Sequence, residues 1–546
     1  MTELHTARSD TAAVDVDAVV VGAGFSGLYM LRRLRDLGLS ARVFEAGDDV
    51  GGTWYWNRYP GARSDSDSTV YCFSDRFDEQ TMNEWRWSER YPTQREIHGY
   101  LRWLADRYDL RRHITFSTKV TAAAFADDSG LWSVTTDSGE CVRTRYLVLA
   151  VGALSKPHIP DFPGLETFGG QWSHTARMPD GGLDYSGKRV AVIGSGATGV
   201  QIVPVVAHEA AHVYAFSRHP YHCLPGRNHV LDDHDWDEIT RNRKRIWERA
   251  RREIGGFPYE EPYGPAGEFP PERIREVFED CWRKGGFRLA NSSFADVITN
   301  EDTNKIYLDF LRVKLESVLR RPELVDKLMP TEPFLSKRPP IEHGYYSAFN
   351  RDNVSLVDLR ENPIGGFTPS GLRMADGTDY DVDVAVLATG FDAITGALLD
   401  MDVRGRDGLR LADKWAEKPT NYLGMAVAGF PNMFMLYCGP YNPAILANGP
   451  TLIELQGEWL ADCLAHLRAG GITSIEARPE AEDRFVRLSD EFAAATLIPR
   501  TASWWTGTNV EGKPRGLRSW VGGLPEYSRV LAEAGQDYTG FVLTKG

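Results

Sequence analysis

The chain has 546 residues, 42% hydrophobic and 25% charged, and its 62 basic and 76 acidic side chains leave a formal net charge of −14. This length predicts more than one domain, and the acidic balance argues against nucleic acid or an anionic membrane as a partner. No run of about 18 apolar residues appears, and the polar start, Met1 to Asp17, lacks the apolar segment of a secretory signal. Six scattered cysteines without a CxxC pair predict reduced thiols and no metal site. We therefore expect a soluble, cytoplasmic protein that acts on a small molecule.

The first predicted unit is a strand, a glycine-rich turn and a helix. Val16 to Val21 is an apolar strand, and the turn after it reads GAGFSG, with Gly22, Gly24 and Gly27. The next strand, Ala41 to Phe44, leads to Glu45, where a carboxylate can accept hydrogen bonds from an adenosine ribose. The pattern predicts a site for FAD or NAD.

A second unit of the same kind begins at the strand Arg189 to Ile193. Its turn reads GSGATG, with Gly194, Gly196 and Gly199, and opens a helix from Ala197 to Ala207 that contains Pro204. The following strand, His212 to Phe216, leads not to an acid but to Ser217 and Arg218. A guanidinium beside a lost carboxylate suits a ribose 2′-phosphate, so this site is predicted to bind NADP.

A sequence pattern that occurs twice indicates that the two units are interleaved along the chain. Tyr146 to Gly152 reads YLVLAVG and Asp383 to Gly390 reads DVAVLATG, each an apolar strand that follows a turn. The predicted fold is α/β, with two Rossmann-like dinucleotide-binding domains. We place the FAD domain at 1–152 and 385–546, the NADP domain at 153–384, and a helical insertion at about 225–330.

One helix of this insertion is amphipathic and basic. Its apolar positions lie between Trp236 and Ile254, with many arginines on the other side, and it should stop at Gly255. Such a helix can bind membranes or calmodulin. The interleaved acidic residues favour instead a helix with an ordinary solvated face.

Two longer motifs carry a family resemblance. An aromatic loop, GGTWYWNRYPGARSD, follows the first unit, and a segment with FGG and a histidine precedes the second. With both fingerprints, the chain resembles the Baeyer–Villiger monooxygenases (type I, class B flavoprotein monooxygenases) over essentially its whole length. The family pattern (A/G)GxWxxxx(F/Y)P(G/M)xxxD is met at Gly51, Gly52, Trp54, Tyr59, Pro60, Gly61 and Asp65. The second pattern, FxGxxxHxxxW, is met at Phe168, Gly170 and His174, but Met178 replaces its tryptophan.

The resemblance implies roles for single residues. Arg338 would stabilise a peroxyflavin and the oxyanion of a Criegee adduct, and Asp65 would orient Arg338. His174 would couple the movement of the two domains. Cofactor contacts are implied for Gly22, Gly24, Gly27, Glu45, Gly52, Trp54, Asp65, Gly194, Gly196, Thr198, Gly199, Arg218, Lys337 and Trp504. Candidates for the substrate pocket are Tyr441, Asn442, Ile445 and Leu446.

The implied activity is an NADPH- and O2-dependent conversion of ketones to esters or lactones, with FAD and NADPH/NADP+ as cofactors and no obligate protein partner. One alternative is a flavin monooxygenase of sulfur or nitrogen, which would use the same nucleotide sites. Another is an idle nucleotide-binding module, which would have no need of Asp65 and Arg338. The ketone itself is not determined by these motifs.

Overall fold

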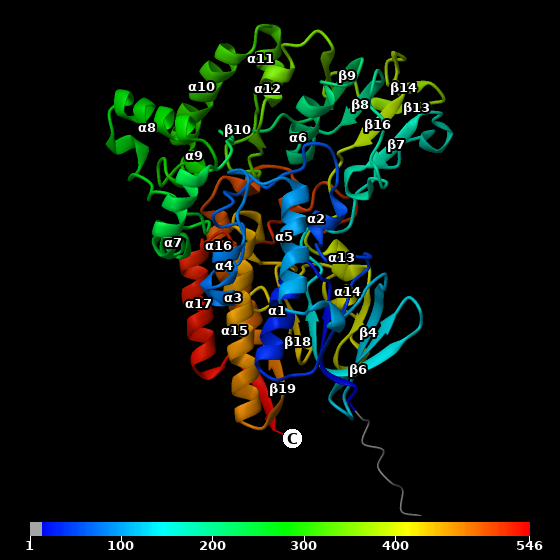
Figure 1. Ribbon diagram of the computed structural model, residues 1–546, viewed down its shortest axis with the longest axis vertical. Helices are drawn as coiled ribbons and strands as arrows, with labels where there is room; N and C mark the ends of the chain where they lie inside the picture. Colours follow the sequence, from blue (N-terminus) through cyan, green and yellow to red (C-terminus); the bar gives the residue numbers. More distant parts are fainter. Residues whose placement is uncertain (1–13, 546) are drawn as a thin grey trace, which may run out of the picture.

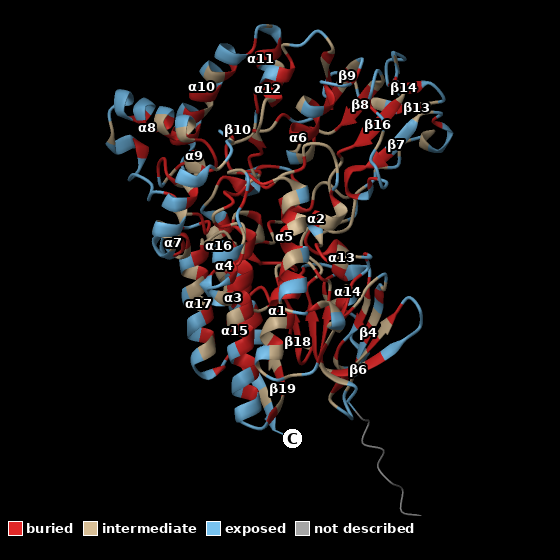
Figure 2. Ribbon diagram, in the orientation of Figure 1, coloured by how far each residue is buried: buried red, intermediate tan, exposed pale blue. Residues whose placement is uncertain are grey.

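The two predicted nucleotide-binding units form two separate sheets in the computed structural model, which describes residues 14–545 (Figure 1). Residues 1–13, which make up most of the polar start of the chain, lie outside the described residues. Within 14–545, no helix is both long and apolar enough to cross a membrane. Figure 2 shows both sheets largely buried, while the surrounding helices expose their outer faces.

The first sheet is built around a parallel core, β6-β1-β2, as expected for a nucleotide-binding unit. Its order is β17-β4-β5-β6-β1-β2-β3, and β18 also pairs with β6. The strands are β1 (Val16–Val21), β2 (Ala41–Phe44), β3 (Ile114–Thr115), β4 (Val120–Ala126), β5 (Leu131–Thr136), β6 (Cys141–Leu149), β17 (Asp402–Arg404) and β18 (Met433–Met435). Strands from both ends of the chain thus share one sheet, which confirms the interleaved α/β architecture.

Helices from both ends of the chain cover this sheet. α1 (Phe25–Asp36) packs against α15 (Gly449–Ala469), and α15 packs in turn against α17 (Leu524–Asp537). The remaining elements of this part are α2 (Thr53–Trp56), α3 (Asp75–Asp78), α4 (Thr81–Glu84), α5 (Gln94–Arg107), α13 (Gly396–Leu399), α14 (Leu411–Lys414), α16 (Pro479–Ala494) and the antiparallel pair β19 (Ile472–Ala477) and β20 (Phe541–Lys545).

The second sheet is entirely parallel, in the order β12-β9-β8-β16-β7. Its strands are β7 (Gln171–His174), β8 (Arg189–Ile193), β9 (His212–Ser217), β12 (Val354–Asp358) and β16 (Val384–Leu387), with α6 (Ala197–Val206) after β8. Beside it lie the meander β13 (Ile364–Thr368), β14 (Gly371–Met374) and β15 (Asp379–Asp381), the pair β10 (Leu224–Pro225) and β11 (Ile341–Glu342), and α12 (Tyr345–Ala348).

The strand pairing corrects one predicted boundary. A division at 384/385 would cut β16, which is hydrogen-bonded between β8 and β7 in the second sheet. The chain therefore leaves the second sheet only after Leu387. The other limits of the two domains stay predictions.

The two segments that cross between the sheets run side by side. The amide of His158 donates to the carbonyl of Gly390 at 2.9 Å, and that of Ile394 donates to the carbonyl of Ala153 at 2.7 Å. The two crossings thus form one hydrogen-bonded connection, and a movement of one sheet against the other must bend both.

The helical insertion comprises α7 (Asp233–Arg252), α8 (Pro271–Lys284), α9 (Arg288–Asn291), α10 (Glu301–Val318) and α11 (Glu323–Leu328). The apolar side of α7 faces inward. Trp236 is buried and its indole N–H donates to the carbonyl of Trp87 at 3.1 Å, while Trp247 packs with Val70. The apolar stripe thus joins the insertion to the first unit, as expected for a helix with an ordinary solvated face.

Candidate active site

The first glycine fingerprint joins β1 to α1 with three different constraints. Gly22 has φ +104°, and a Cβ there would lie 2.6 Å from the carbonyl oxygen of Ala150. A Cβ on Gly27 would lie 1.8 Å from the carbonyl oxygen of Gly22, so this glycine permits the helix to approach the strand. Gly24 faces Gly52, with 3.4 Å between its Cβ position and the Gly52 Cα. The turn leaves backbone N–H groups at the start of α1, where a pyrophosphate is favoured.

Glu45 lies at the end of β2, beside this turn. Its two oxygens accept from the backbone amides of Ala23 at 2.7 Å and Gly47 at 2.8 Å, which holds the carboxylate in place. Burial raises the pKa of Glu45, although these amide hydrogen bonds oppose the shift. Each carboxylate oxygen has a second lone pair for a ribose hydroxyl.

The second fingerprint repeats the geometry between β8 and α6. Gly194 has φ +119°, and a Cβ on Gly199 would lie 2.0 Å from the carbonyl oxygen of Gly194. A Cβ on Gly196 would instead have the side chain of Tyr221, at 3.9 Å, as its nearest neighbour outside the turn. Backbone packing therefore demands Gly199, whereas Gly196 leaves open space of the kind that a phosphate occupies.

Both fingerprints open into one cavity of about 1160 Å³. This volume exceeds the roughly 300–1,000 Å³ of a pocket for one small ligand. The predicted residues that line it are Gly22, Gly24, Glu45, Gly52, Trp54, Asp65, Gly194, Gly196, Thr198, Arg218, Lys337, Arg338, Asn442, Ile445 and Trp504. Gly27 and Gly199 do not line it, because their place is in the contact between helix and strand.

Arg338 and Asp65 form a bidentate ion pair on the cavity wall. Nε and Nη2 of Arg338 lie 2.7 and 3.0 Å from the two carboxylate oxygens of Asp65, and Nη1 donates to the carbonyl of Ile445 at 3.0 Å. The guanidinium carbon lies 4.7 Å from the ring centroid of Phe287, in the insertion. Burial disfavours the charge of Arg338, but Asp65 outweighs it and holds the arginine pKa above its usual value. The site therefore keeps a fixed, oriented cation.

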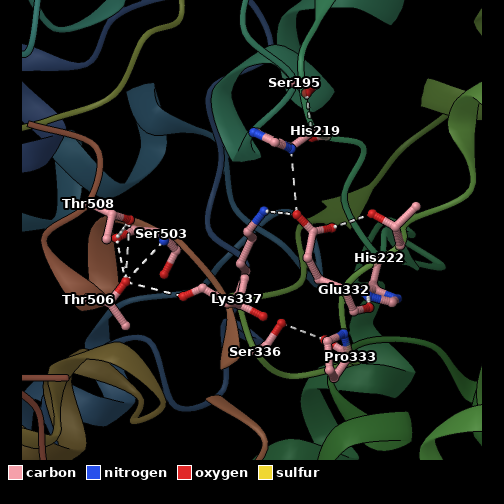
Figure 3. A network of polar contacts seen from close by, with 12 residues as sticks. Ser195, His219, His222, Glu332, Pro333, Ser336, Lys337, Ser503, Thr506 and Thr508 are labelled. Carbon is pink, nitrogen blue, oxygen red and sulfur yellow. Dashed lines mark hydrogen bonds and ion pairs between the residues drawn. The ribbon is translucent and has the colours of Figure 1, made fainter. Parts of the chain in front are cut away.

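The side chain of Lys337 extends into a polar network with Glu332 and His219 (Figure 3). Its ammonium lies 2.8 Å from Oε1 of Glu332, and the lysine side chain is only 6% exposed. Oε1 of Glu332 also lies 3.6 Å from Nδ1 of His219. The sequence motifs did not single out Glu332; its position in the same loop, five residues before Lys337, is the only signal of this pairing.

His174 lies at the end of β7 and contacts the second crossing. Its Nδ1 accepts from the amide of Ala176 at 3.1 Å, so its Nε2 carries the proton and donates to the carbonyl of Gly390 at 2.9 Å. Burial lowers the pKa of His174 to about 4, and the ring is neutral near pH 7. Met178 fills the position of the family tryptophan as a buried side chain in the core of the second unit.

The C-terminal loop covers the cavity from another side. Trp504 is half-buried and lines the cavity, whereas its neighbour Trp505 is fully buried in a small apolar cluster. Lys513 donates to a carboxylate oxygen of Asp392, on the second crossing, at 2.6 Å. The loop is thereby attached to the hinge between the two sheets.

The predicted pocket loop is only partly in contact with the cavity. Asn442 and Ile445 line it, whereas Tyr441 and Leu446 do not. Tyr441 is 1% exposed, packs in the core of the first unit, and has φ +55°. Leu446 packs beside the cluster that contains Trp505. These two side chains thus do not reach the cavity wall: Tyr441 is directed into the core of the first unit, and the half-buried Leu446 packs beside the Trp505 cluster.

The fold and this site define a two-nucleotide flavoprotein whose reaction chamber holds a fixed arginine. The model of the flavin-binding monooxygenase-like family matches residues 16–242. A Baeyer–Villiger monooxygenase of Pseudooceanicola batsensis is 40% identical over 99% of this chain and 98% of its own. A phenazine N-monooxygenase of Lysobacter antibioticus is 40% identical over 98% of each chain. The crystal structure of OTEMO in complex with FAD and NADP superposes with a TM-score of 0.93 at 38% identity, covering 97% of this chain and 100% of that one.

The chain belongs to the Baeyer–Villiger monooxygenase family of flavoproteins. The predicted family resemblance is confirmed, and so is the predicted fold of two Rossmann-like units. These relatives are enzymes, so they do not support the alternative of an idle nucleotide-binding module.

Proposed function

We propose that the protein uses NADPH, O2 and FAD to convert ketones to esters or lactones. The observation that carries the proposal is the Arg338–Asp65 ion pair, which faces a cavity shared by both glycine fingerprints. A fixed cation at this point is suited to stabilise the negative charge that develops when a ketone carbonyl is attacked. FAD, when bound, supplies the hydride acceptor and the activation of oxygen.

The residues present fit both nucleotides. Gly24 and the start of α1 would bind the FAD pyrophosphate, and Glu45 its adenosine ribose. Gly196 and the start of α6 would bind the pyrophosphate of NADP(H). Arg218 and Lys337, which line the same cavity, would bind the 2′-phosphate.

The other assigned residues position the reactants and exclude water. Asp65 holds the Arg338 guanidinium by two hydrogen bonds, so that its remaining N–H groups have a defined direction. Trp54 and Trp504 cover the cavity with aromatic surface. His174, hydrogen-bonded to the crossing at Gly390, would transmit movement between the two units.

Asn442 and Ile445 are the substrate-contact residues of this proposal. Both come from the loop after β18, and the carbonyl of Ile445 is bonded to Arg338. A ketone held there lies next to the cation. We also infer a cytoplasmic location, which the six free cysteines support.

The proposal is tested with the FAD-loaded protein, NADPH and a panel of cyclic, linear and aromatic ketones. Products are identified by mass, because NADPH consumption alone also reports futile oxidase turnover. We expect an ester or lactone from at least one ketone, formed with one NADPH and one O2 per product. Reduction of the flavin without any ester would overturn the ketone assignment.

A heteroatom oxidase is the second candidate, favoured by the similarity to a phenazine N-monooxygenase. The same panel therefore includes a phenazine and an aryl methyl sulfide. Formation of the N-oxide or sulfoxide without any ester would replace the ketone activity with this one. Formation of both would identify a ketone enzyme that tolerates heteroatoms.

A further inference from the structure

The carboxylate of Glu332 lies among the basic side chains near the second fingerprint. Oε1 of Glu332 is 2.8 Å from the Lys337 ammonium and 3.6 Å from Nδ1 of His219 (Figure 3). Arg218 lines the same cavity, and within residues 14–545 its side chain forms no hydrogen bond or ion pair. Arg360, whose charge also acts on His219, is already paired with Asp358. Glu332 is thus the acid paired with the lysine assigned to the coenzyme phosphate.

Neighbouring residues hold this ion pair in place. The backbone carbonyl of Glu332 accepts from Nε2 of His222 at 2.9 Å, and His222 is buried with its pKa lowered by that burial to about 4. The Lys337 ammonium lies 5.3 Å from the ring centroid of Tyr221. Burial disfavours the charge of Glu332, but hydrogen bonding and attraction from Lys337 outweigh it and hold the glutamate pKa below its usual range. Glu332 is therefore a carboxylate near neutral pH.

We propose that Glu332 occupies, as a carboxylate, the position on Lys337 that the 2′-phosphate of NADP(H) takes, and so limits how tightly this coenzyme is held. The inference rests on the proposed function of the second fingerprint. An incoming phosphate must draw Lys337 away from Glu332 or share it, and in both cases it comes close to a like charge. NAD(H) has no phosphate at this place and leaves the ion pair intact.

The exchange of phosphate for Glu332 as the partner of Lys337 avoids an unpaired buried charge. A lysine that is only 6% exposed is costly to leave without a partner when the phosphate departs. Glu332 supplies that partner from the same loop, so that release of NADP+ leaves no isolated ammonium. Glu332 therefore determines both the retention of the coenzyme and the margin by which NADP(H) is preferred over NAD(H).

The experiment compares wild type with Glu332→Gln, which keeps the size of the side chain and removes its charge. Dissociation constants for NADP+, 2′,5′-ADP and NAD+ are measured by calorimetry on the oxidised, FAD-loaded proteins. We expect the variant to bind NADP+ and 2′,5′-ADP about tenfold more tightly. Its dissociation constant for NAD+ should stay within about twofold of wild type, because that ligand does not meet the charge.

Glu361→Gln is the matched control, since it removes an exposed carboxylate that is paired with Lys327 in the same region. It should leave the dissociation constants of all three ligands unchanged. Adding Glu332→Gln to Lys337→Ala should change NADP+ affinity less than it does alone, because the two residues act through one contact. Glu332→Ser serves as the second neutral variant if the glutamine protein does not fold.

An unchanged or weaker affinity for NADP+ in folded, FAD-loaded Glu332→Gln would overturn the inference. Weaker binding would show that Glu332 orients Lys337 for the phosphate and does not compete with it. Equal tightening for NAD+ would also overturn it, because the effect would not come from the phosphate. A wild-type protein that prefers NAD+ would instead contradict the assignment of the second fingerprint to NADP, and with it this inference.

Discussion

Arg338 and Asp65 are 273 residues apart in the chain, yet their side chains form two parallel hydrogen bonds on the wall of the reaction cavity. Asp65 ends the aromatic loop of the first unit, whereas Arg338 follows the helical insertion. Neither unit can therefore form this part of the site alone. The pair exists only while the segment that carries Arg338 is docked on the first unit.

Replacing Arg338 by alanine should abolish oxygenation while leaving flavin reduction by NADPH in place. Loss of one fixed donor to a developing oxyanion costs about 100- to 1,000-fold in rate. The measurement is ester formed per NADPH consumed. Arg338→Lys keeps the charge but not the bidentate geometry. It should form an amount of ester per NADPH between those of wild type and Arg338→Ala. Ester formation by Arg338→Ala at the wild-type rate would contradict the assigned role.

Asp65→Asn should destabilise the folded protein, because it leaves the half-buried Arg338 guanidinium without its counter-charge. We expect the free energy of unfolding to fall by about 1–3 kcal/mol, measured by urea titration of the FAD-loaded protein. The double variant Asp65→Asn, Arg338→Ala should lose less than the sum of the two single changes. Strict additivity would show that the ion pair contributes nothing to stability.

His174 should make the protein less stable in acid. The unfolded chain takes up a proton near pH 6.5, but in the folded state burial lowers the His174 pKa to about 4. The stability contributed by the neutral ring is therefore present above pH 6.5 and is lost as the pH falls toward 4, amounting to about 2 kcal/mol by pH 5. His174→Gln does not titrate, so unfolding curves at pH 7.5 and pH 5 should differ less for the variant. Identical pH dependence in both proteins would contradict this prediction.

Two glycines of the second fingerprint should respond differently to alanine. Gly199→Ala places its Cβ 2.0 Å from the Gly194 carbonyl oxygen and should destabilise the fold by several kcal/mol. The Cβ of Gly196→Ala comes no closer than 3.9 Å to its nearest neighbour, Tyr221, so this variant should fold normally and lose affinity for NADP+. Melting temperature and NADP+ titration separate the two effects. Normal NADP+ binding by Gly196→Ala would show that no phosphate lies there.

Ile445→Ala should widen the substrate range toward bulkier ketones, because Ile445 lines the cavity. Leu446→Ala is the matched control: this side chain packs beside the apolar cluster that contains Ile445 and Trp505, but it does not line the cavity. The control should lower the melting temperature and leave the order of preferred ketones unchanged. Competition between a small and a bulky ketone measures the ratio of kcat/KM directly. A shift of that ratio in Leu446→Ala but not in Ile445→Ala would reverse the assignment.

The nucleotide units were predictable because their signals are local. β1, β2 and β8 have the limits expected from their apolar runs, and α6 differs by one residue from the expected helix, which continues through Pro204. A glycine turn between a buried strand and a helix leaves the backbone few alternatives.

Other features depend on contacts between distant segments. β16 could have belonged to either sheet on its sequence, and only its pairing with β8 and β7 assigns it to the second. The inward turn of Tyr441 requires a positive φ at a residue that is not glycine, which no local pattern predicts. The pairing of Glu332 with Lys337 depends on the conformation of their loop.

The sequence by itself determined that this protein holds two different nucleotides, since the glycine turns and the residues after the next strand, Glu45 and Arg218, are read within short stretches of chain. Only the tertiary structure decided how the reaction chamber is assembled. It brought Asp65 to Arg338, excluded Tyr441 and Leu446 from the cavity, and gave Lys337 a carboxylate partner. The physical reason is that backbone geometry is a local property, whereas the direction and pairing of a side chain depend on every segment that packs around it.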